Sequence, residues 1–73
     1  MIVTVEPSDK LPGLVCHKGQ ELNLVLEGGI EVLFDDKRIA LSKEDSIYFD
    51  PAHPHGQRAI GGKTARFLTV IAE

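Results

Sequence analysis

His17-Lys-Gly-Gln-Glu-Leu-Asn-Leu-Val-Leu-Glu-Gly28 is the stretch that decides the fold, and it has a counterpart downstream in Asp45-Ser-Ile-Tyr-Phe-Asp-Pro-Ala-His-Pro-His55. Each segment is a short β pattern that carries a histidine next to a turn. The first segment also places a glutamate, Glu21, four residues after its histidine. Two imidazoles and a carboxylate are good ligands for a divalent metal, so the two segments together predict a metal site.

The spacing of His17 and Glu21 sets a geometric condition on that site. On a straight strand each residue rises about 3.3 Å, so the two residues would lie roughly 13 Å apart. Metal–ligand bonds of about 2 Å cannot span that distance. If the two residues share a site, Lys18-Gly19-Gln20 must form a tight bend, and Gly19 is the residue that permits one.

The composition is typical of one small folded domain without a nucleic-acid or membrane surface. The chain has 73 residues, 42% of them hydrophobic, and a net charge of −3 with eight basic residues scattered along it. It offers no basic stripe for phosphates, so no direct contact with nucleic acid is expected. It shows no signal peptide and no apolar run near the ~20 residues of a membrane span, and its single cysteine, Cys16, cannot form an internal disulfide. We therefore expect a cytoplasmic protein.

Glycine and proline interrupt the sequence at short intervals, and β-strand patterns fill the segments between them. Strands are expected over residues 2–5, 14–17, 21–26, 30–34, 38–41, 46–49, 56–60 and 64–71. No window of a dozen residues shows helical periodicity. Short strands at this spacing predict an all-β sandwich or barrel.

The same residues resemble the two signature motifs of the cupin superfamily. The first motif is matched by His17-x3-Glu21-x6-Gly28 and the second by Asp45…Pro51-Ala-His-Pro-His55. Both segments are closer still to the C-terminal cupin of bacterial regulators that carry an N-terminal helix-turn-helix of the XRE type. The resemblance covers roughly residues 14 to 72. It implies a single cupin domain over residues 1–73, folded as a double-stranded β-helix, or jelly-roll, barrel.

The resemblance also implies a metal site, and it carries three of the family's four ligands onto this chain. His17, Glu21 and His55 match ligand positions, whereas Val15 stands where the family has another histidine. A His-Glu-His set can still hold a divalent metal with open positions, and Fe, Mn, Zn and Ni are the candidates. The alternative is that no metal binds, because Val15 replaces a usual ligand. His17 would then be a partly buried histidine that hydrogen-bonds Glu21.

Two amides are candidates for binding a ligand or cofactor. Asn23 is two residues from Glu21, and Gln57 is two residues from His55, so each is expected to point to the same side of its strand as that residue. Both amides are therefore expected to reach the cavity. A buried amide needs hydrogen-bond partners, and a bound molecule would supply them for Asn23. A cross-strand hydrogen bond would satisfy Asn23 equally well.

Other residues near the motifs are expected outside the site. Cys16 faces the opposite way from His17, so it should point out of the barrel. His53 lies across Pro54 from His55, and a position at the rim or surface is expected for it.

Three functions are compatible with these residues. The first, which the resemblance favours, is a small-molecule effector-sensing barrel that serves as the ligand-binding and dimerisation module of a bacterial transcriptional regulator. The second is a small metal-dependent cupin enzyme of isomerase or dioxygenase type. Glu21 and His17 could serve such an enzyme as base and acid, but not while they hold a metal. The third is a dimerisation domain with a vestigial cavity.

A homodimer is expected, because a chain this short buries only about 60% of its unfolded surface and leaves edge strands open. The β-branched run Ile2-Val-Thr-Val5 is expected at the interface, either by strand pairing or by packing of two sheets. The alternative is that this run pairs within its own sheet, next to Leu68-Thr-Val-Ile71.

Overall fold

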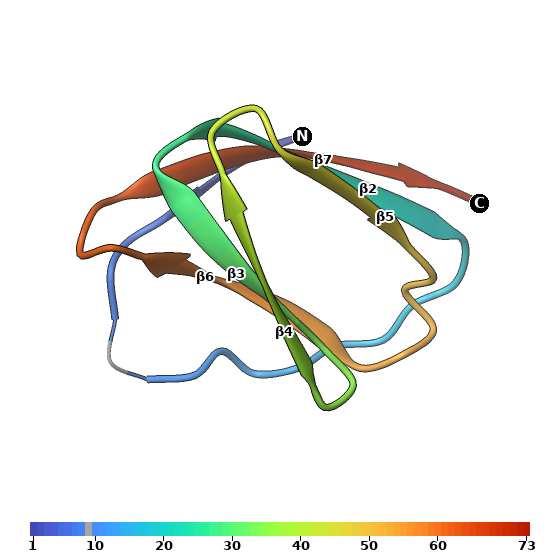
Figure 1. Ribbon diagram of the computed structural model, residues 1–73. Coiled ribbons are helices and arrows are strands. Elements are labelled where there is room, and N and C mark those ends of the chain that lie inside the picture. The colour runs from blue at the N-terminus through green and yellow to red at the C-terminus, as the bar shows by residue number, and fades with distance from the viewer. Residues whose placement is uncertain (9) are drawn as a thin grey trace.

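Two antiparallel sheets make up the structure, a computed structural model that describes residues 1–8 and 10–73 (Figure 1). The strands of this described part are β1 (Ile2–Val5), β2 (Gln20–Glu27), β3 (Gly29–Phe34), β4 (Lys37–Ser42), β5 (Ser46–Phe49), β6 (His55–Ile60) and β7 (Ala65–Ala72). Sheet A has the strand order β1-β7-β2-β5, and sheet B has the order β4-β3-β6. The all-β architecture expected from the sequence is confirmed. The described residues contain no helix, and so no helix long and apolar enough to cross a membrane.

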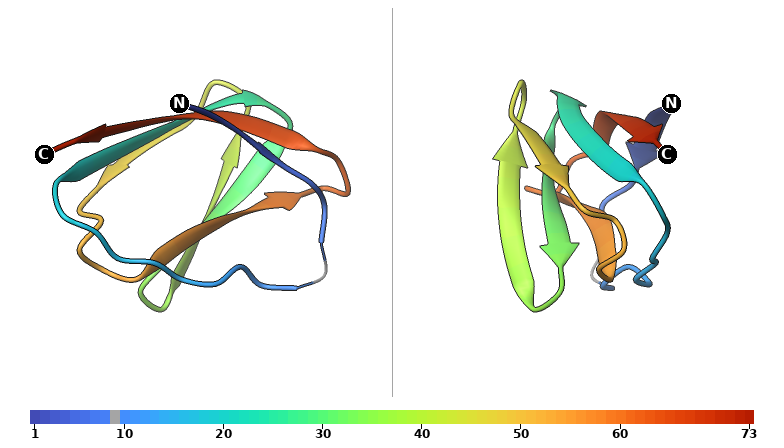
Figure 2. Two further views of the ribbon diagram at one scale, coloured as in Figure 1. Left: turned by 180° about the vertical axis from the view of Figure 1, so that it is seen from behind. Right: turned by 90° about the vertical axis from the view of Figure 1, so that its right-hand side faces the viewer.

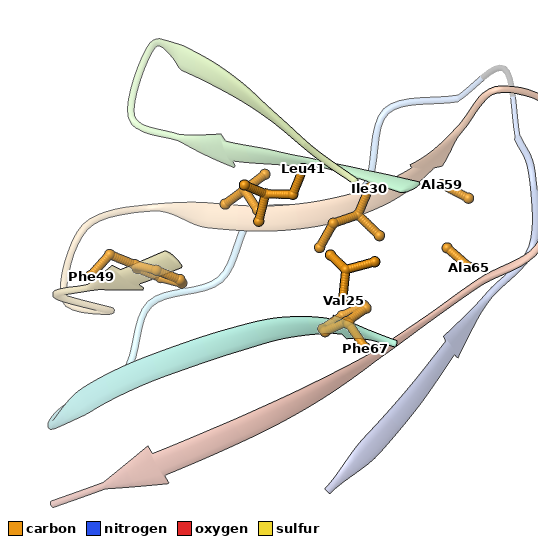
Figure 3. Packing of buried hydrophobic residues seen from close by; sticks show 8 residues of the cluster. Val25, Ile30, Leu41, Phe49, Ala59, Ala65 and Phe67 are labelled. Carbon is orange, nitrogen blue, oxygen red and sulfur yellow. The ribbon is translucent and has the colours of Figure 1, made fainter. Parts of the chain in front are cut away.

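The two sheets face each other across one hydrophobic core (Figure 2). The core contains residues from both sheets, among them Val25, Ile30, Leu41, Ala59 and Phe67 (Figure 3). Their burial follows the period-two alternation of strands, since Val25 is buried while its neighbours on β2 are half-exposed. Removing this apolar surface from water is the main force that holds the two sheets together.

Aromatic residues follow the same alternation. Phe49 is buried in the core and Tyr48, its neighbour on β5, is exposed, as expected for a strand with one inner face. Phe67 is buried, and Phe34 packs against the core from a partly buried position. The polar segment Ser42 to Asp45 forms a turn, in which the Ser42 amide donates to the Asp45 carboxylate at 2.9 Å.

The strand expected over residues 14–17 is wrong as a regular element. Val15 alone pairs there, in an isolated bridge whose two backbone hydrogen bonds to His55 both measure 3.0 Å. The amide of His17 instead donates to the carbonyl of Pro51 at 2.9 Å. The segment thus contacts the first residue of β6 at His55 and the turn between β5 and β6 at Pro51, and no ladder extends beyond the single bridge.

The N-terminal run pairs within its own chain. β1 lies antiparallel to β7, with Ile2 opposite Leu68 and Val5 opposite Ala65. This is the intramolecular pairing that the sequence offered as an alternative. β1 is the edge of sheet A, so its other side still carries no neighbouring strand of this chain among the described residues.

Candidate metal centre

One end of the barrel interior is polar. Along β2 the inward-facing residues change from Val25 to Asn23 and Glu21, and each is buried. On the neighbouring strand β7 the partner of Val25 is Phe67, whereas the partner of Asn23 is Thr69. The core therefore gives way to a polar cluster where β2 begins.

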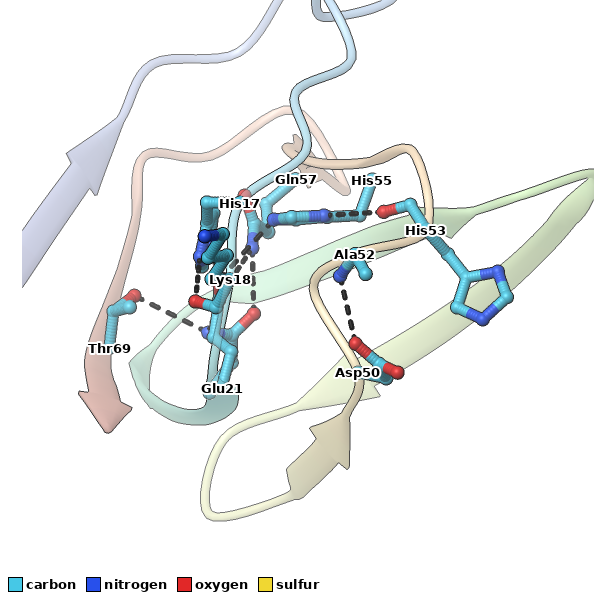
Figure 4. Close-up of polar contacts among 10 residues, drawn as sticks. His17, Lys18, Glu21, Asp50, Ala52, His53, His55, Gln57 and Thr69 are labelled. Atoms are coloured by element: carbon cyan, nitrogen blue, oxygen red, sulfur yellow. Dashed lines mark hydrogen bonds and ion pairs between the residues drawn. The ribbon is translucent and has the colours of Figure 1, made fainter. Parts of the chain in front are cut away.

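His17, Glu21 and His55 converge at this polar end (Figure 4). One ligand atom from each lies within 4.8 Å of the others. The Nε2 atoms of His17 and His55 lie 2.9 and 3.3 Å from the same Glu21 oxygen, Oε1. Glu21 and His55 are almost fully buried, and the side chain of His17 is 31% exposed. The expected convergence is confirmed, and the role of the three residues as metal ligands stays a prediction.

The bend between His17 and Glu21 is built on Gly19, as the spacing required. Gly19 has a φ of +103°, a conformation that other residues rarely adopt. A Cβ at this position would lie 2.2 Å from the backbone carbonyl oxygen of Ala72 on β7. Both the backbone angle and the close approach of β7 therefore require glycine here.

Backbone carbonyls orient both imidazoles. The Nδ1–H of His17 donates to the Lys18 carbonyl at 3.1 Å, and the Nδ1–H of His55 donates to the His53 carbonyl at 2.9 Å. A carbonyl oxygen can only accept, so the hydrogen of each neutral ring resides on Nδ1. A neutral ring held in this way presents its Nε2 lone pair to a metal, whereas the hydrogen bond of His17 to Glu21 Oε1 at 2.9 Å requires a second proton, on Nε2. Fixing a ring through its second nitrogen is the usual way in which proteins prepare a histidine for a metal.

The pKa of His17 is raised above its ordinary value of 6.5. The largest cause is the hydrogen bond to the Lys18 carbonyl, followed by the hydrogen bond to Glu21 and the negative charges of Glu21 and Glu73. Partial desolvation of the ring acts in the opposite direction. The surroundings of His17 therefore favour a positive charge on this side of the cluster.

The second oxygen of Glu21 is held by amides. Its Oε2 accepts from Nδ2 of Asn23 at 2.9 Å and from Nε2 of Gln57 at 3.2 Å. Gln57 also donates to the Asn23 carbonyl oxygen at 2.7 Å, and Asn23 donates to the Thr69 hydroxyl at 3.4 Å. Asn23 and Gln57 thus reach the site, as expected. Asn23 makes cross-strand hydrogen bonds, which was one of the two alternatives that the sequence left open for it.

The donor set fits a divalent cation. Two imidazole lone pairs and one carboxylate oxygen face a single point, where their mutual repulsion is relieved only by a proton or a metal ion. Borderline nitrogen ligands with one hard oxygen suit Fe, Zn and Ni, and two histidines with one carboxylate are typical of Fe(II) sites with open positions. The residues present are therefore compatible with the metal that the sequence predicts.

The remaining candidates lie outside the cluster. Cys16 is exposed, and His53 is an exposed residue with its Nδ1 3.2 Å from the Asp35 carboxylate. Val15 is bonded to His55 through the backbone, but its side chain is 57% exposed and forms no apolar wall of the site. An open cavity of about 360 Å³ beside Arg58 and the Gly61–Gly62 turn lies at the other end of β6 from His55 and shares no residue with the cluster.

The sequence did not single out Thr69 or the carbonyls of Lys18 and His53. Thr69 carried a usable signal, because it is a polar residue in the otherwise apolar run 67–71, the same irregularity that drew attention to Asn23. The two carbonyls carried none, since every residue has one and only the folded backbone aims it.

Comparison with known proteins gives a family match over nearly the whole chain. A family model described as a cupin domain matches residues 1–71. Comparison with curated protein sequences finds no match.

Three solved structures are similar over nearly all of this chain. The protein TT1209 from Thermus thermophilus has a TM-score of 0.84 at 22% identity, over 97% of this chain and 68% of its own. Hydroxypropylphosphonic acid epoxidase from S. wedmorenis, in complex with fosfomycin, has a TM-score of 0.88 at 26% identity, over 97% of this chain and 41% of its own. An HTH_3 family transcriptional regulator from Vibrio cholerae has a TM-score of 0.69 at 27% identity, over 100% of this chain and 36% of its own. The chain thus spans less than half the length of the epoxidase and of the regulator.

Proposed function

The chain belongs to the cupin family, and on this premise we propose that it is a small-molecule effector-sensing barrel, the ligand-binding module of a bacterial transcriptional regulator, with a divalent metal at its binding site. His17, Glu21 and His55 would hold the metal, and Asn23 and Gln57 would fix the Glu21 carboxylate. A metal bound there supplies open coordination positions for an oxygen or nitrogen atom of the effector.

The observation that carries this proposal is the convergence of three donor atoms that are already oriented. Each ring is held by a backbone carbonyl, and Glu21 is held by two amides, so little side-chain ordering is left for the binding step. Both backbone and side-chain contacts therefore favour a preformed cation site over a cluster that forms on binding.

The chemistry of the surrounding groups favours binding over turnover. Apart from the histidines, the described side chains that hydrogen-bond Glu21 are Asn23 and Gln57. Both are neutral amides, which do not exchange protons at ordinary pH. Such groups suit recognition of a polar molecule better than general acid–base catalysis. The similarity to a transcriptional regulator at 27% identity supports the same reading.

A metal-dependent cupin enzyme of isomerase or dioxygenase type is the second candidate. The similarity to an epoxidase at 26% identity favours it, as does a three-ligand set that leaves coordination positions open for a reactant. The two candidates share the metal site and differ in the fate of the bound molecule.

The metal site is tested by titrating untagged, metal-stripped protein with Mn²⁺, Fe²⁺ (without oxygen), Zn²⁺ and Ni²⁺ in a calorimeter. We expect one equivalent of at least one ion to bind. Glu21→Gln and His55→Ala should lose that binding, because each removes one of three donors, whereas His53→Gln should keep it as a histidine control outside the cluster. Binding that is absent, or that survives both substitutions, would refute the site.

The choice between sensor and enzyme is tested on the metal-loaded protein. Small organic acids are screened for those that raise the midpoint of thermal unfolding, and each binder is recovered and analysed by mass spectrometry. A sensor returns the molecule intact, whereas an enzyme returns a product. Conversion of the recovered molecule would decide in favour of the second candidate.

A further inference from the structure

A single loop, residues 50–54 between β5 and β6, supports both histidines of the candidate metal centre. Its Pro51 carbonyl accepts the backbone N–H of His17 at 2.9 Å, and its His53 carbonyl accepts the Nδ1–H of His55 at 2.9 Å (Figure 4). Pro51 is buried, whereas His53 is exposed. The conformation of this loop therefore sets where His17 lies and how the ring of His55 is turned.

The turn between β3 and β4 contacts the exposed part of this loop. The backbone N–H of Asp35 donates to the Pro54 carbonyl at 2.9 Å, and the carboxylate oxygen Oδ2 of Asp35 lies 3.2 Å from Nδ1 of His53. A carboxylate oxygen accepts, so the ring of His53 donates its Nδ1–H there. Asp35 thus contacts both residues that precede His55, one through its backbone and the other through its side chain.

Packed rings connect the same turn to His55 by a second route. The ring centroid of Phe34, the residue before Asp35, lies 5.3 Å from that of His53 and 5.5 Å from that of Phe49. The ring of Phe49 in turn meets the ring of His55 edge to face, at 5.0 Å between centroids. Rings packed in this way restrict one another, because edge-to-face arrangements have preferred geometries. The His55 ring is therefore held both by a hydrogen bond from the loop and by packing.

The turn itself does not require the carboxylate of Asp35. Asp35 has a φ of +54°, a conformation in which glycine is unstrained and asparagine is tolerated. Either of these residues would connect Phe34 to Lys37, which pair across the turn, at least as well as aspartate does. The carboxylate therefore has its consequence outside the turn, at His53.

We propose that Asp35 is a positioning residue of the metal centre, which holds the loop 50–54 in the conformation that orients His55 and places His17. The proposal rests on the proposed metal site, and it adds a residue from a turn that supplies none of the ligands. The side chains of His53 and Asp35 are 53% and 41% exposed, so water weakens their contact. Exposed pairs of this kind change an equilibrium constant by up to about fivefold. An effect of that size weakens metal binding without abolishing it, which distinguishes it from the loss of a ligand.

The first test compares the affinities of untagged variants for Zn²⁺ and Ni²⁺ by calorimetry. Asp35→Gly removes the carboxylate and suits the positive φ, so binding should weaken about threefold to fivefold while the midpoint of urea denaturation changes little. Asp35→Asn also removes the charge but keeps an oxygen that accepts from His53, so its affinity should remain that of the wild type. Asp36→Gly, at the other residue of the turn, is the matched control and should also keep its affinity.

The second test needs no metal. Amide hydrogen exchange, followed by NMR in EDTA, measures how often the hydrogen bond from the His17 N–H to the Pro51 carbonyl opens. In Asp35→Gly this amide should exchange about threefold to fivefold faster, whereas the amides between β2 and β7 should keep their wild-type rates. A residue that only stabilised the fold would change the amides between β2 and β7 as well.

Three results would overturn the proposal. The first is wild-type affinity together with wild-type exchange at His17 in Asp35→Gly. The second is an equal loss of affinity in Asp35→Gly, Asp35→Asn and Asp36→Gly, which would show an effect of charge alone. The third is exchange that rises equally at His17 and between β2 and β7. If the wild-type chain binds neither ion, the affinities report on the proposed metal site, and the exchange rate at His17 still decides whether Asp35 holds the loop.

Discussion

At Glu21 the two oxygens of one carboxylate have different partners. Oε1 faces the imidazoles of His17 and His55, and Oε2 accepts hydrogen bonds from Asn23 and Gln57. The carboxylate cannot turn Oε2 toward a metal without giving up two hydrogen bonds. We therefore expect Glu21 to bind a metal through Oε1 alone. We also expect the two amides to raise the affinity of the site for the metal.

The contribution of the amides is tested by Gln57→Leu, which keeps a similar side-chain size and removes both hydrogen-bond donations. The buried Asn23 carbonyl oxygen then loses its partner, and the free energy of unfolding should fall by about 1–3 kcal/mol in urea denaturation. Metal affinity in the calorimeter should fall by about 10–100-fold, because Glu21 is less firmly held. Gln20→Leu, an exposed glutamine on β2, is the control. Equal affinities in Gln57→Leu and wild type would contradict this role.

His17 makes stability depend on pH. Its pKa is raised in the folded state above 6.5, mainly by the Lys18 carbonyl and then by Glu21, so the folded state binds the proton more tightly than the unfolded state. The stabilisation is fully present below pH 6.5 and is lost as the pH rises through the raised value. In EDTA, the loss of stability on His17→Gln should be larger at about pH 5.5 than at about pH 8.5, as measured by urea denaturation. Equal losses at both pH values would contradict the shift.

At this scale the sequence predicted the cluster but not all of its contacts. The spacing of His17 and Glu21, with Gly19 between them, is a local property and was sufficient to predict their approach. The partner of Asn23 could not be chosen, because Thr69 lies 46 residues away and becomes its neighbour only through the register of β2 with β7. Contacts of that kind depend on tertiary pairing, which local pattern does not encode.

The bend before β2 tolerates the fewest residue types, because it requires glycine at position 19. Gly19→Ala would place a methyl group on a backbone with positive φ and against the carbonyl of Ala72. We expect the free energy of unfolding to fall by about 2 kcal/mol or more. Metal affinity should fall with it, because His17 is displaced from Glu21. Urea denaturation and calorimetry are the measurements.

The control for this substitution is Gly13→Ala. Gly13 has no atom within 4 Å of a Cβ built on it and no positive φ, so the change should alter stability by less than about 0.5 kcal/mol. If Gly19→Ala were as stable as Gly13→Ala, the bend would not depend on glycine.

Regular strands were easier to predict than the segment that carries His17. The expected strands 21–26 and 38–41 differ by one residue at each end from β2 and β4, because alternation and turn residues mark both. Residues 14–17 have a similar composition but form only one bridge, between Val15 and His55, and a local pattern cannot reveal how far a distant partner runs alongside.

For the whole molecule, the all-β barrel was predictable and the assignment of strands to sheets was not. Short strands separated by turns exclude a helical fold, and the resemblance to cupins specified the barrel. Nothing local to Ile2–Val5 determines whether it pairs with β7 or with another chain, since both choices bury the same β-branched residues. The structure selects β7.

The central position of β7 in sheet A also governs when this protein can fold during its synthesis. β1 and β2 both pair with β7, although β1 leaves the ribosome first and β7 emerges about sixty residues later. Sheet B, whose strands lie between residues 29 and 60, has all its members available earlier. Until residues 65–72 clear the exit tunnel, β1 therefore lacks its partner in the sheet and β2 is unpaired on one side, and during that interval these apolar strands are open to chaperones.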